Sequence, residues 1–168
     1  ASAGPGSSPH LGAELFRERA GVDIVHIPYS GAAPAINDLV GGQVDMAVLN
    51  LAASLQFIRS GRLKALAYAN DKRSPLLPDV PTLAESGVKG AESASWYSLA
   101  APKGTPPEVL QRLNDAVAKV NANPEYAKLM QAQGVDLWNM MPQEATAFVE
   151  KDQTAMRKLV QAAGLMKK

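Results

Sequence analysis

The sequence predicts an α/β fold built on a mainly parallel sheet, because segments typical of strands alternate with segments of helical periodicity. Residues 22–27, 44–49 and 63–69 are rich in β-branched or apolar side chains and read as strands. Residues 44–49 are nearly continuous in apolar side chains apart from one aspartate, as expected for a parallel strand covered on both faces. Strands joined through helices imply crossover connections between neighbouring parallel strands.

Three helices are expected in the first part of the chain. The first begins with Ser8 as its N-cap and Pro9 in the first helical position, and it continues into the amphipathic segment 11–20. The second covers Ala32–Val40, where apolar residues recur at helical spacing, and the third is a short helix over 54–60. Gly41-Gly42 ends the second helix and Gly61 ends the third.

The composition of the sequence changes after residue 70. Residues 72–82 contain three prolines, which have no backbone N–H to donate to a β-ladder. This segment is therefore predicted to be an ordered loop. Thr82 and Glu85 fit the capping box of a short helix that runs through Ser86. The remaining expected elements are a strand over 93–101, a helix over 108–121 capped by Thr105, a helix over 124–133, a short strand over 135–138 and a final helix introduced by Pro142.

Composition narrows the function classes. The chain has 168 residues, of which 46% are hydrophobic, enough for one domain of ordinary size or two small ones. Its 17 basic and 16 acidic residues are interspersed and give a net charge of +1, which disfavours nucleic-acid binding. The absence of cysteine excludes disulfides, thiolate metal sites and thiol catalysis. No apolar run reaches the roughly 20 residues that a membrane-spanning helix requires.

The most informative stretch is the glycine loop, residues 4–8, which leads into the first helix. Small residues free its backbone, and a helix start exposes four amides without intrahelical partners. The macrodipole adds roughly half a positive charge at that end, so a carboxylate or phosphate could be held there without Lys or Arg. The alternative is that this segment is a helix cap and nothing more.

A dinucleotide-binding fingerprint is only partly present. Gly4 and Gly6, with Asp23 further along the chain, imitate its glycines and its acidic residue. Its third glycine position is Pro9, which has no amide hydrogen to offer a pyrophosphate. The sequence therefore predicts no nicotinamide or flavin cofactor.

The two histidines do not form a recognisable catalytic or metal-binding pattern. Neither His10 nor His26 belongs to a ligand spacing such as His-Glu-x-x-His. Ser7 or Ser8 with His10 lacks the Gly-x-Ser-x-Gly elbow of a hydrolase. We expect His10 to support the glycine loop by a hydrogen bond and His26 to be a satisfied strand residue. Paired carboxylates are also missing from the glycine-flanked loops, so we predict no enzyme activity and no metal.

Small polar side chains follow each of the first strands. They are Ser7 and Ser8 after residues 1–3, which look like the end of a strand, Tyr29 and Ser30 after residues 22–27, and Asn50 and Ser54 after residues 44–49. Because the carboxyl ends of parallel strands share one edge, these residues are expected to converge and to suit the orientation of a small anion. Taken singly, each could instead be a helix cap or a turn residue.

Several blocks in order carry a resemblance to a known family. They are Gly6-Ser7-Ser8-x-His10-Leu11, Glu14-Leu15-Phe16, His26-Ile27-Pro28-Tyr29-x-Gly31-x-x-Pro34-Ala35, Gly41-Gly42-Gln43-Val44-Asp45, Lys64-Ala65-Leu66-Ala67, the run from Arg73 to Gly87, and Ala101-Pro102-x-Gly104-Thr105-Pro106. Across essentially the whole chain, they resemble the substrate-binding proteins of tripartite tricarboxylate transporters, also called the Bug family. The run from Arg73 to Gly87 is especially specific.

The resemblance implies a periplasmic-binding-protein-like fold of type II, with lobe two complete and the C-terminal part of lobe one. Residues 1–92 would be lobe two, and 93–168 the crossover strand and the returning part of lobe one, with Trp96 near the crossing. It implies a periplasmic protein without catalysis that closes on a small organic carboxylate and presents it to membrane permease subunits. Loop amides, hydroxyls and bridging waters would hold the carboxylate.

The resemblance also implies the site residues and the state of the chain. Ligand-facing residues would be Gly4, Gly6, Ser7, Ser8, His10, Tyr29, Gly31 and Asn50. Family members are roughly twice as long, so we expect the N-terminal part of the family's sequence to be lacking, and exposed sheet edges to favour dimerisation or strand exchange. The alternative function is a ligand-sensing effector domain of a regulator with the same two-lobe fold.

Overall fold

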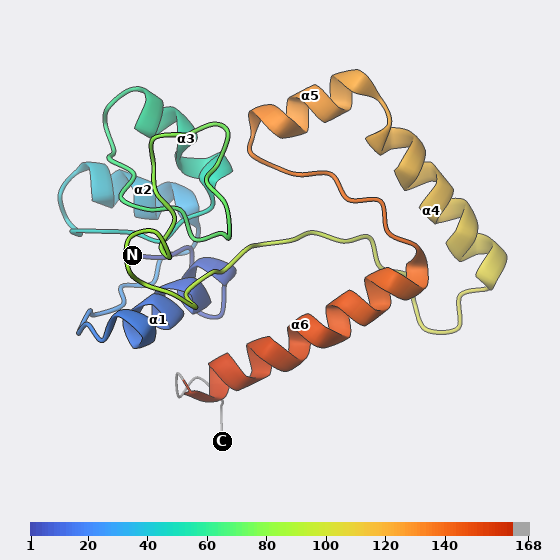
Figure 1. The fold of residues 1–168 in the computed structure, drawn as a ribbon, viewed down its shortest axis with the longest axis horizontal. Helices are drawn as coiled ribbons and strands as arrows, with labels where there is room; N and C mark the ends of the chain where they lie inside the picture. Colours follow the sequence, from blue (N-terminus) through green and yellow to red (C-terminus); the bar gives the residue numbers. More distant parts are fainter. Residues whose placement is uncertain (163–168) are drawn as a thin grey trace. The chain divides into compact units, whose positions relative to one another are not determined.

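The computed structural model describes residues 1–162, which contain six helices and divide into two compact units (Figure 1). The first unit comprises residues 1–95 together with the last described residues, 159–162, and the second comprises Trp96–Lys158. The helices are α1 (Ser8–Ala20), α2 (Ala32–Val40), α3 (Leu51–Arg59), α4 (Pro107–Asn121), α5 (Pro124–Ala132) and α6 (Pro142–Ala162). None of the described helices is long and apolar enough to cross a bilayer.

The first extended segment of the chain lies between two others in the first unit. On one side, the Ser2 N–H donates to the Ile27 carbonyl (3.4 Å) and the Ser2 carbonyl accepts from the Tyr29 N–H (3.2 Å). On the other side, the amino group and carbonyl of Ala1 bond to residues 46–48 at 2.7 and 3.1 Å. All three segments run parallel, with helices α1 and α2 connecting them in the expected crossover order.

The expected strands at 22–27, 44–49 and 63–69 are not regular strands. Within residues 1–162 the only β pairing consists of isolated parallel bridges, Ser2–Pro28 and Tyr68–Thr82. The central segment ends at once because the chain turns at Gly4, whose φ is +127°, so its neighbours find few backbone groups to pair with. The parallel order is present, but a continuous ladder is not.

The core of the first unit is small and lies around α2 and α3, which pack against each other. Ala35 and Ile36 of α2 and Leu55 of α3 are buried, as is Ala91. The bounds of α2 agree with the expected Ala32–Val40. Helix α3 begins at Leu51 rather than at residue 54, because Asn50 already adopts the extended conformation of an N-cap.

The expected capping box is present in the proline-rich loop. The Thr82 N–H donates to Glu85 Oε2 (2.7 Å), and the Glu85 N–H donates to Thr82 Oγ1 (3.1 Å). The segment that follows is a turn rather than a helix, because the chain reverses at Gly87, whose φ is +94°. Arg73 also donates to Glu85 Oε2 (2.8 Å), which ties the two ends of the loop together.

The second unit contains α4, α5 and α6 as far as Lys158, with their connections. Thr105 is not the cap of α4, since Pro106 holds that position and the Thr105 hydroxyl instead donates to the Pro102 carbonyl (2.8 Å). Asn123 caps α5 by accepting from two first-turn amides. Trp96 donates through Nε1 to Asp152 of α6 (3.0 Å).

The strands expected at 93–101 and 135–138 do not form either. Ser93 makes one backbone hydrogen bond, to the Ala69 carbonyl (2.9 Å), before the chain passes into the second unit. At 135–138, the side chain of Asn121 takes the role of a ladder partner and donates to the Trp138 carbonyl (3.1 Å). A single side-chain donor satisfies one carbonyl but cannot build a strand.

Candidate functional site

The three helices of the first unit begin at one edge of the parallel segments. Residues 27–29, 1–3 and 46–48 lie side by side in the same direction, and each leads into a helix start. The starts of α1, α2 and α3 therefore share the edge formed by the carboxyl ends of these segments, where α/β proteins commonly bind ligands. The expected sharing of one edge by these segments is thus present in the backbone.

The glycine loop is fixed by two residues with positive φ. Gly4 has φ +127°, and a Cβ on it would lie 2.9 Å from the Tyr29 carbonyl oxygen. Gly6 has φ +74° and has open space where a Cβ would be. Gly4 is therefore required both by backbone conformation and by the close approach of Tyr29, whereas Gly6 is required only by its left-handed conformation.

Ser7, not Ser8, is the N-cap of α1. Ser7 has an extended backbone (φ −69°, ψ 157°), its Oγ accepts from the His10 N–H at 3.3 Å, and it donates to the Gly4 carbonyl at 2.7 Å. Ser8 and Pro9 are the first two helical residues. The N-cap lies one residue earlier than expected because the turn at Gly4 already directs Ser7 toward the helix.

Most amides of the glycine loop have partners inside the protein, contrary to the expected set of four free donors. Those of Gly4, Gly6 and Ser7 donate to Ser2 Oγ, His10 Nδ1 and the Gly4 carbonyl. Pro9 has no N–H, and the His10 amide donates to the Ser7 cap. Among the described residues, no partner is present for the Ser8 N–H, and Ser8 is exposed. The donors open to a ligand are therefore this amide and the Ser8 hydroxyl, because the Ser7 hydroxyl already donates to the Gly4 carbonyl.

His10 supports the glycine loop, as expected. Its ring is buried, and its Nδ1 accepts from the Gly6 N–H at 2.9 Å. Its Nε2 lies 3.9 Å from Glu14 Oε1. His26 is also satisfied, with Nε2 at 2.6 Å from Ser2 Oγ. The pKa of His26 is lowered, mainly by burial and then by the charges of His10 and of the chain's amino group. The charge of Glu14 acts in the opposite direction and raises it.

Tyr29 contributes its backbone to the edge and turns its hydroxyl to α2. The hydroxyl donates to Asp38 Oδ2 at 2.7 Å, and this hydrogen bond is the main reason why the pKa of Tyr29 is raised. The Tyr29 N–H donates to the Ser2 carbonyl. The close approach to Gly4 places the Tyr29 backbone beside the glycine loop.

Gly31 and Asn50 stand at the starts of α2 and α3. Both are N-cap residues, but Gly31 has no side chain and the side chain of Asn50 makes no capping hydrogen bond. Asn50 Oδ1 instead accepts from the Ser95 hydroxyl at 3.1 Å. Its amide nitrogen has no partner among the described residues, so Asn50 joins the edge with a donor available.

The three helix starts at this edge share one electrostatic property. No acidic residue lies in the first turn of α1, α2 or α3. A carboxylate side chain is favourable at a helix start, because the dipole is positive there. Without one, each of these three helix starts keeps its partial positive charge unbalanced. Such an edge is suited to an anion supplied from outside the chain.

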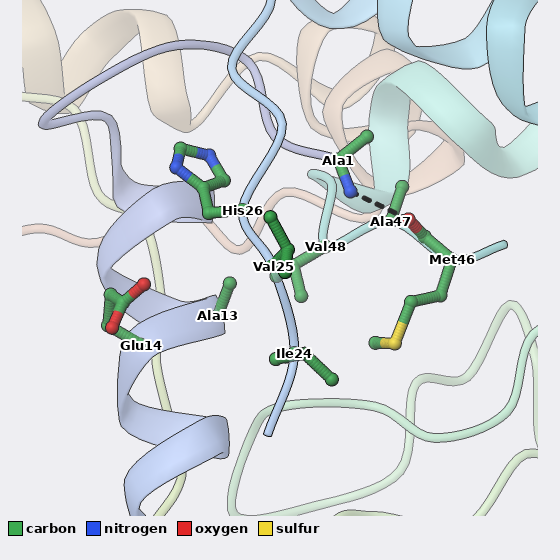
Figure 2. A pocket seen from close by; sticks show the side chains of 9 residues that line it. All are labelled: Ala1, Ala13, Glu14, Ile24, Val25, His26, Met46, Ala47 and Val48. Carbon is green, nitrogen blue, oxygen red and sulfur yellow. Dashed lines mark hydrogen bonds between the residues drawn. The ribbon is translucent and has the colours of Figure 1, made fainter. Parts of the chain in front are cut away.

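The first unit also contains a small cavity away from the loop amides (Figure 2). It has a volume of about 30 Å³ and is lined by Ala1, Ala13, Glu14, Ile24, Val25, His26, Met46, Ala47 and Val48. Figure 2 shows the amino group of Ala1 bonded to the Met46 carbonyl at its rim. This volume suits about one water molecule and is far below that of a metabolite pocket.

Ser2 and Ser95 also belong to this region, although no sequence pattern indicates them. Ser2 is fully buried, and its hydroxyl joins the Gly4 amide to His26. Ser95 bonds across the sequence to Asn50. A serine carries no periodic or motif signal that would distinguish these two from the other serines of the chain. Across residues 1–162 no group of three or more His, Asp or Glu side chains could hold a metal ion.

Comparison with solved structures defines the class of protein. The chain matches R. palustris Rpa4515 with adipate at a TM-score of 0.86 and 37% identity, covering 95% of this chain and 53% of that one. It matches the periplasmic binding protein BugD at a TM-score of 0.82 and 37% identity, covering 97% and 55%. The fold is therefore α/β and periplasmic-binding-protein-like, as expected.

Sequence comparison then gives the family. Residues 1–165 match the TctC family, described as tripartite tricarboxylate transporter family receptor, and the chain belongs to it. A Pseudomonas sp. relative, the UPF0065 protein in the tcbD-tcbE intergenic region, is 37% identical over 161 residues, which is 95% of this chain and 48% of the relative. The chain spans about half the length of the curated relatives it matches. A receptor family agrees with the expectation of binding without catalysis.

Proposed function

We propose that this chain forms part of an extracytoplasmic solute-binding protein that captures a small organic carboxylate for a tripartite tricarboxylate-type transporter. The observation that carries the proposal is the set of three acid-free helix starts at one edge. A carboxylate at this edge would interact with three dipole ends and needs no Lys or Arg. The bound adipate of the R. palustris relative supports the choice of a carboxylate as ligand class.

The ligand-facing groups in this proposal are the eight residues expected from the sequence. Gly4 and Gly6 shape the loop, His10 holds it, and Ser7 and Ser8 carry hydroxyls and the one unpartnered loop amide. Tyr29, Gly31 and Asn50 bring the second and third helix starts to the same edge. Bridging waters would complete the shell, since internal hydrogen bonds already occupy most loop amides.

The setting of the protein follows from the same proposal. As part of a periplasmic receptor, the chain would contribute lobe two through residues 1–92 and part of lobe one through 93–168, and would present its ligand to membrane permease subunits. The division of the chain at Ser95 and Trp96 supports an assignment of this kind. The family match favours transport over a sensing domain of a regulator.

Self-association is a further part of the proposal. The parallel segments pair over short stretches, and backbone edges of this kind recruit strands from another chain. We expect size-exclusion chromatography with light scattering to give a dimer or a larger species at high concentration. A clean monomer under those conditions would contradict this part.

Calorimetry with adipate, malate and citrate tests the ligand class, with uncharged adipamide as the control ligand. The decisive variant is Ser8→Glu, because it adds a carboxylate to the exposed first turn of α1. Like charges about 4 Å apart repel by several kcal/mol at an effective dielectric near 20, so affinity for the carboxylates should fall more than about tenfold. The helix itself should gain about 0.3–1 kcal/mol.

Ser8→Gln is the matched control, since it has the same size without the charge. Its side-chain amide can donate a hydrogen bond in place of the Ser8 hydroxyl, so it should bind carboxylates much more tightly than Ser8→Glu does. Equal loss of binding in both variants would point to a steric effect, and absence of carboxylate binding by the parent chain would contradict the proposed function.

A further inference from the structure

Two histidine rings stack directly beneath the glycine loop. The rings of His10 and His26 have centroids 3.9 Å apart and planes inclined by 12°. His10 is 4% exposed, and His26 comes from the neighbouring parallel segment. The stack therefore joins the first turn of α1 to a different stretch of backbone.

Each ring is connected to one amide of the loop, that of His10 directly and that of His26 through Ser2. The Gly6 N–H donates to His10 Nδ1 at 2.9 Å, while the Gly4 N–H donates to Ser2 Oγ at 3.3 Å. Ser2 Oγ in turn lies 2.6 Å from His26 Nε2. Both glycines with unusual backbone conformations are thus tied to the stacked pair, one directly and one through a fully buried serine.

We propose that Ser2, His26 and His10 are positioning residues for the glycine loop, and that a proton taken up by His10 releases the loop. A histidine nitrogen accepts a hydrogen bond only while it carries no proton. When a proton from solvent binds His10 Nδ1, an N–H would face the Gly6 N–H, and the two donors must separate. The consequence for the ligand rests on the function proposed above, but the release of the loop does not.

The charges around the pair set how it takes up a proton. Glu14 of α1 lies 3.9 Å from His10 Nε2 and favours positive charge there, although Arg17 pairs with Glu14 at 2.9 Å. At His26, burial lowers the pKa most, and the charges of the His10 ring and of the Ala1 amino group lower it further. Two positively charged rings at this separation of 3.9 Å would repel each other.

A pH titration of the full chain, followed by the amide and imidazole nitrogen resonances, tests the proposal without any ligand. The Gly6 amide resonance should shift along the same curve as His10 Nδ1 between pH 8 and 5. Gly104 of the second unit, also at positive φ, is the control and should stay flat. A Gly6 amide that does not follow His10 would overturn the proposal.

Two variants separate a positioning role from a merely structural one. His10→Asn places an amide oxygen where Nδ1 was, so it keeps an acceptor for the Gly6 N–H but cannot titrate. Its Gly6 resonance should resemble that of the neutral parent and lose its pH dependence. His10→Ala removes the acceptor and should shift the Gly6 amide at every pH. Retained pH dependence of Gly6 in His10→Asn would contradict the proposal.

Adipate binding gives the second arm. As the pH falls and the Gly6 resonance shifts, the parent should lose up to about fivefold in affinity, the worth of one hydrogen bond, while His10→Asn should change little over the same range. If Gly6 follows His10 but adipate does not bind at either pH, the positioning role stands and the proposed function fails. If adipate binds and Gly6 stays flat, the proposed function stands and the positioning role fails.

Discussion

The helices of the two units differ at their first turns. Helices α1, α2 and α3 of the first unit have no acidic residue there. Each helix of the second unit has one: Glu108 in α4, Glu125 in α5 and Glu144 in α6. The second unit thus neutralises its own helix dipoles, whereas the first leaves three positive ends at a shared edge. The contrast supports the proposal that the anion binds to the first unit.

The units also differ in what they bury. The first unit buries Ile36 and Leu55 in the contact between α2 and α3. No described residue of 96–158 is buried, and α4 exposes an apolar stripe along one face. The stripe is formed by Val109, Leu113, Val117 and Val120. A unit without a core relies on local helix stability, so we expect the second unit to unfold first.

The largest expected effect is on the free energy of unfolding, and it compares a buried side chain of the first unit with an exposed one of the second. Ile36→Ala should destabilise the first unit by about 2–5 kcal/mol, because Ile36 is 2% exposed and leaves a cavity. Val117→Ala in α4 is the matched control, and it should cost far less because this side chain is 37% exposed. Urea unfolding followed by far-ultraviolet circular dichroism measures both. Equal costs would show that the two units are packed alike.

The second prediction compares the two glycines of the loop. Gly4→Ala should cost about 1–3 kcal/mol and alter the loop, since the added Cβ meets the Tyr29 carbonyl. Gly6→Ala keeps open space around its Cβ and should cost about 1–2 kcal/mol for the left-handed backbone alone. Urea unfolding gives the costs, and calorimetry with adipate should show a larger loss of affinity for Gly4→Ala. A reversed order would show that the contact with Tyr29 does not constrain the loop.

The third prediction uses one N-cap from each unit. Ser7→Ala removes the acceptor of the His10 amide, and Asn123→Ala removes the acceptor of two amides of α5. Each should cost about 1 kcal/mol in its own unit. Both tryptophans, Trp96 and Trp138, lie in the second unit, so the fluorescence transition should move for Asn123→Ala and not for Ser7→Ala. Identical shifts of fluorescence would mean that the units unfold together.

The smallest effect is a dependence of stability on pH that is confined to the first unit. Both histidines lie there, and the folded-state pKa of His26 is below its ordinary value near 6.5. The unfolded chain therefore binds a proton more readily, so the stability from neutral His26 is complete above about pH 6.5 and is lost as pH falls through the folded pKa. His26→Gln should remove the part of this dependence that comes from His26. Circular dichroism should detect it in the parent, while tryptophan fluorescence between pH 8 and 5 should not.

The sequence predicted helices better than strands, and the reason is physical. Helix bounds follow from local spacing and from terminators such as Gly61, so α2 was predicted at its observed bounds and α5 to within one residue. A parallel ladder depends on distant partners, and the turn at Gly4 leaves the central segment too short to build one. The capping box at Thr82 formed as its pattern indicates, although the helix expected after it did not.

Part of the candidate site was accessible to the same reasoning. The glycine loop and the role of His10 as its support follow from backbone rules and from hydrogen-bond inventory. The cap was assigned to Ser8 instead of Ser7, because the sequence does not give the direction in which the chain leaves Gly4. The stack of His10 on His26 and the link through Ser2 depend on three-dimensional packing, so no local pattern could predict them.

An adipate titration of the isotopically labelled chain, followed by backbone amide resonances at pH 8, tests the central claim most directly. We expect shifts at the Ser8 amide and at the starts of α2 and α3, with the starts of α4, α5 and α6 unchanged. Shifts confined to the helices of the second unit, or none at adipate concentrations that saturate a related receptor, would contradict it.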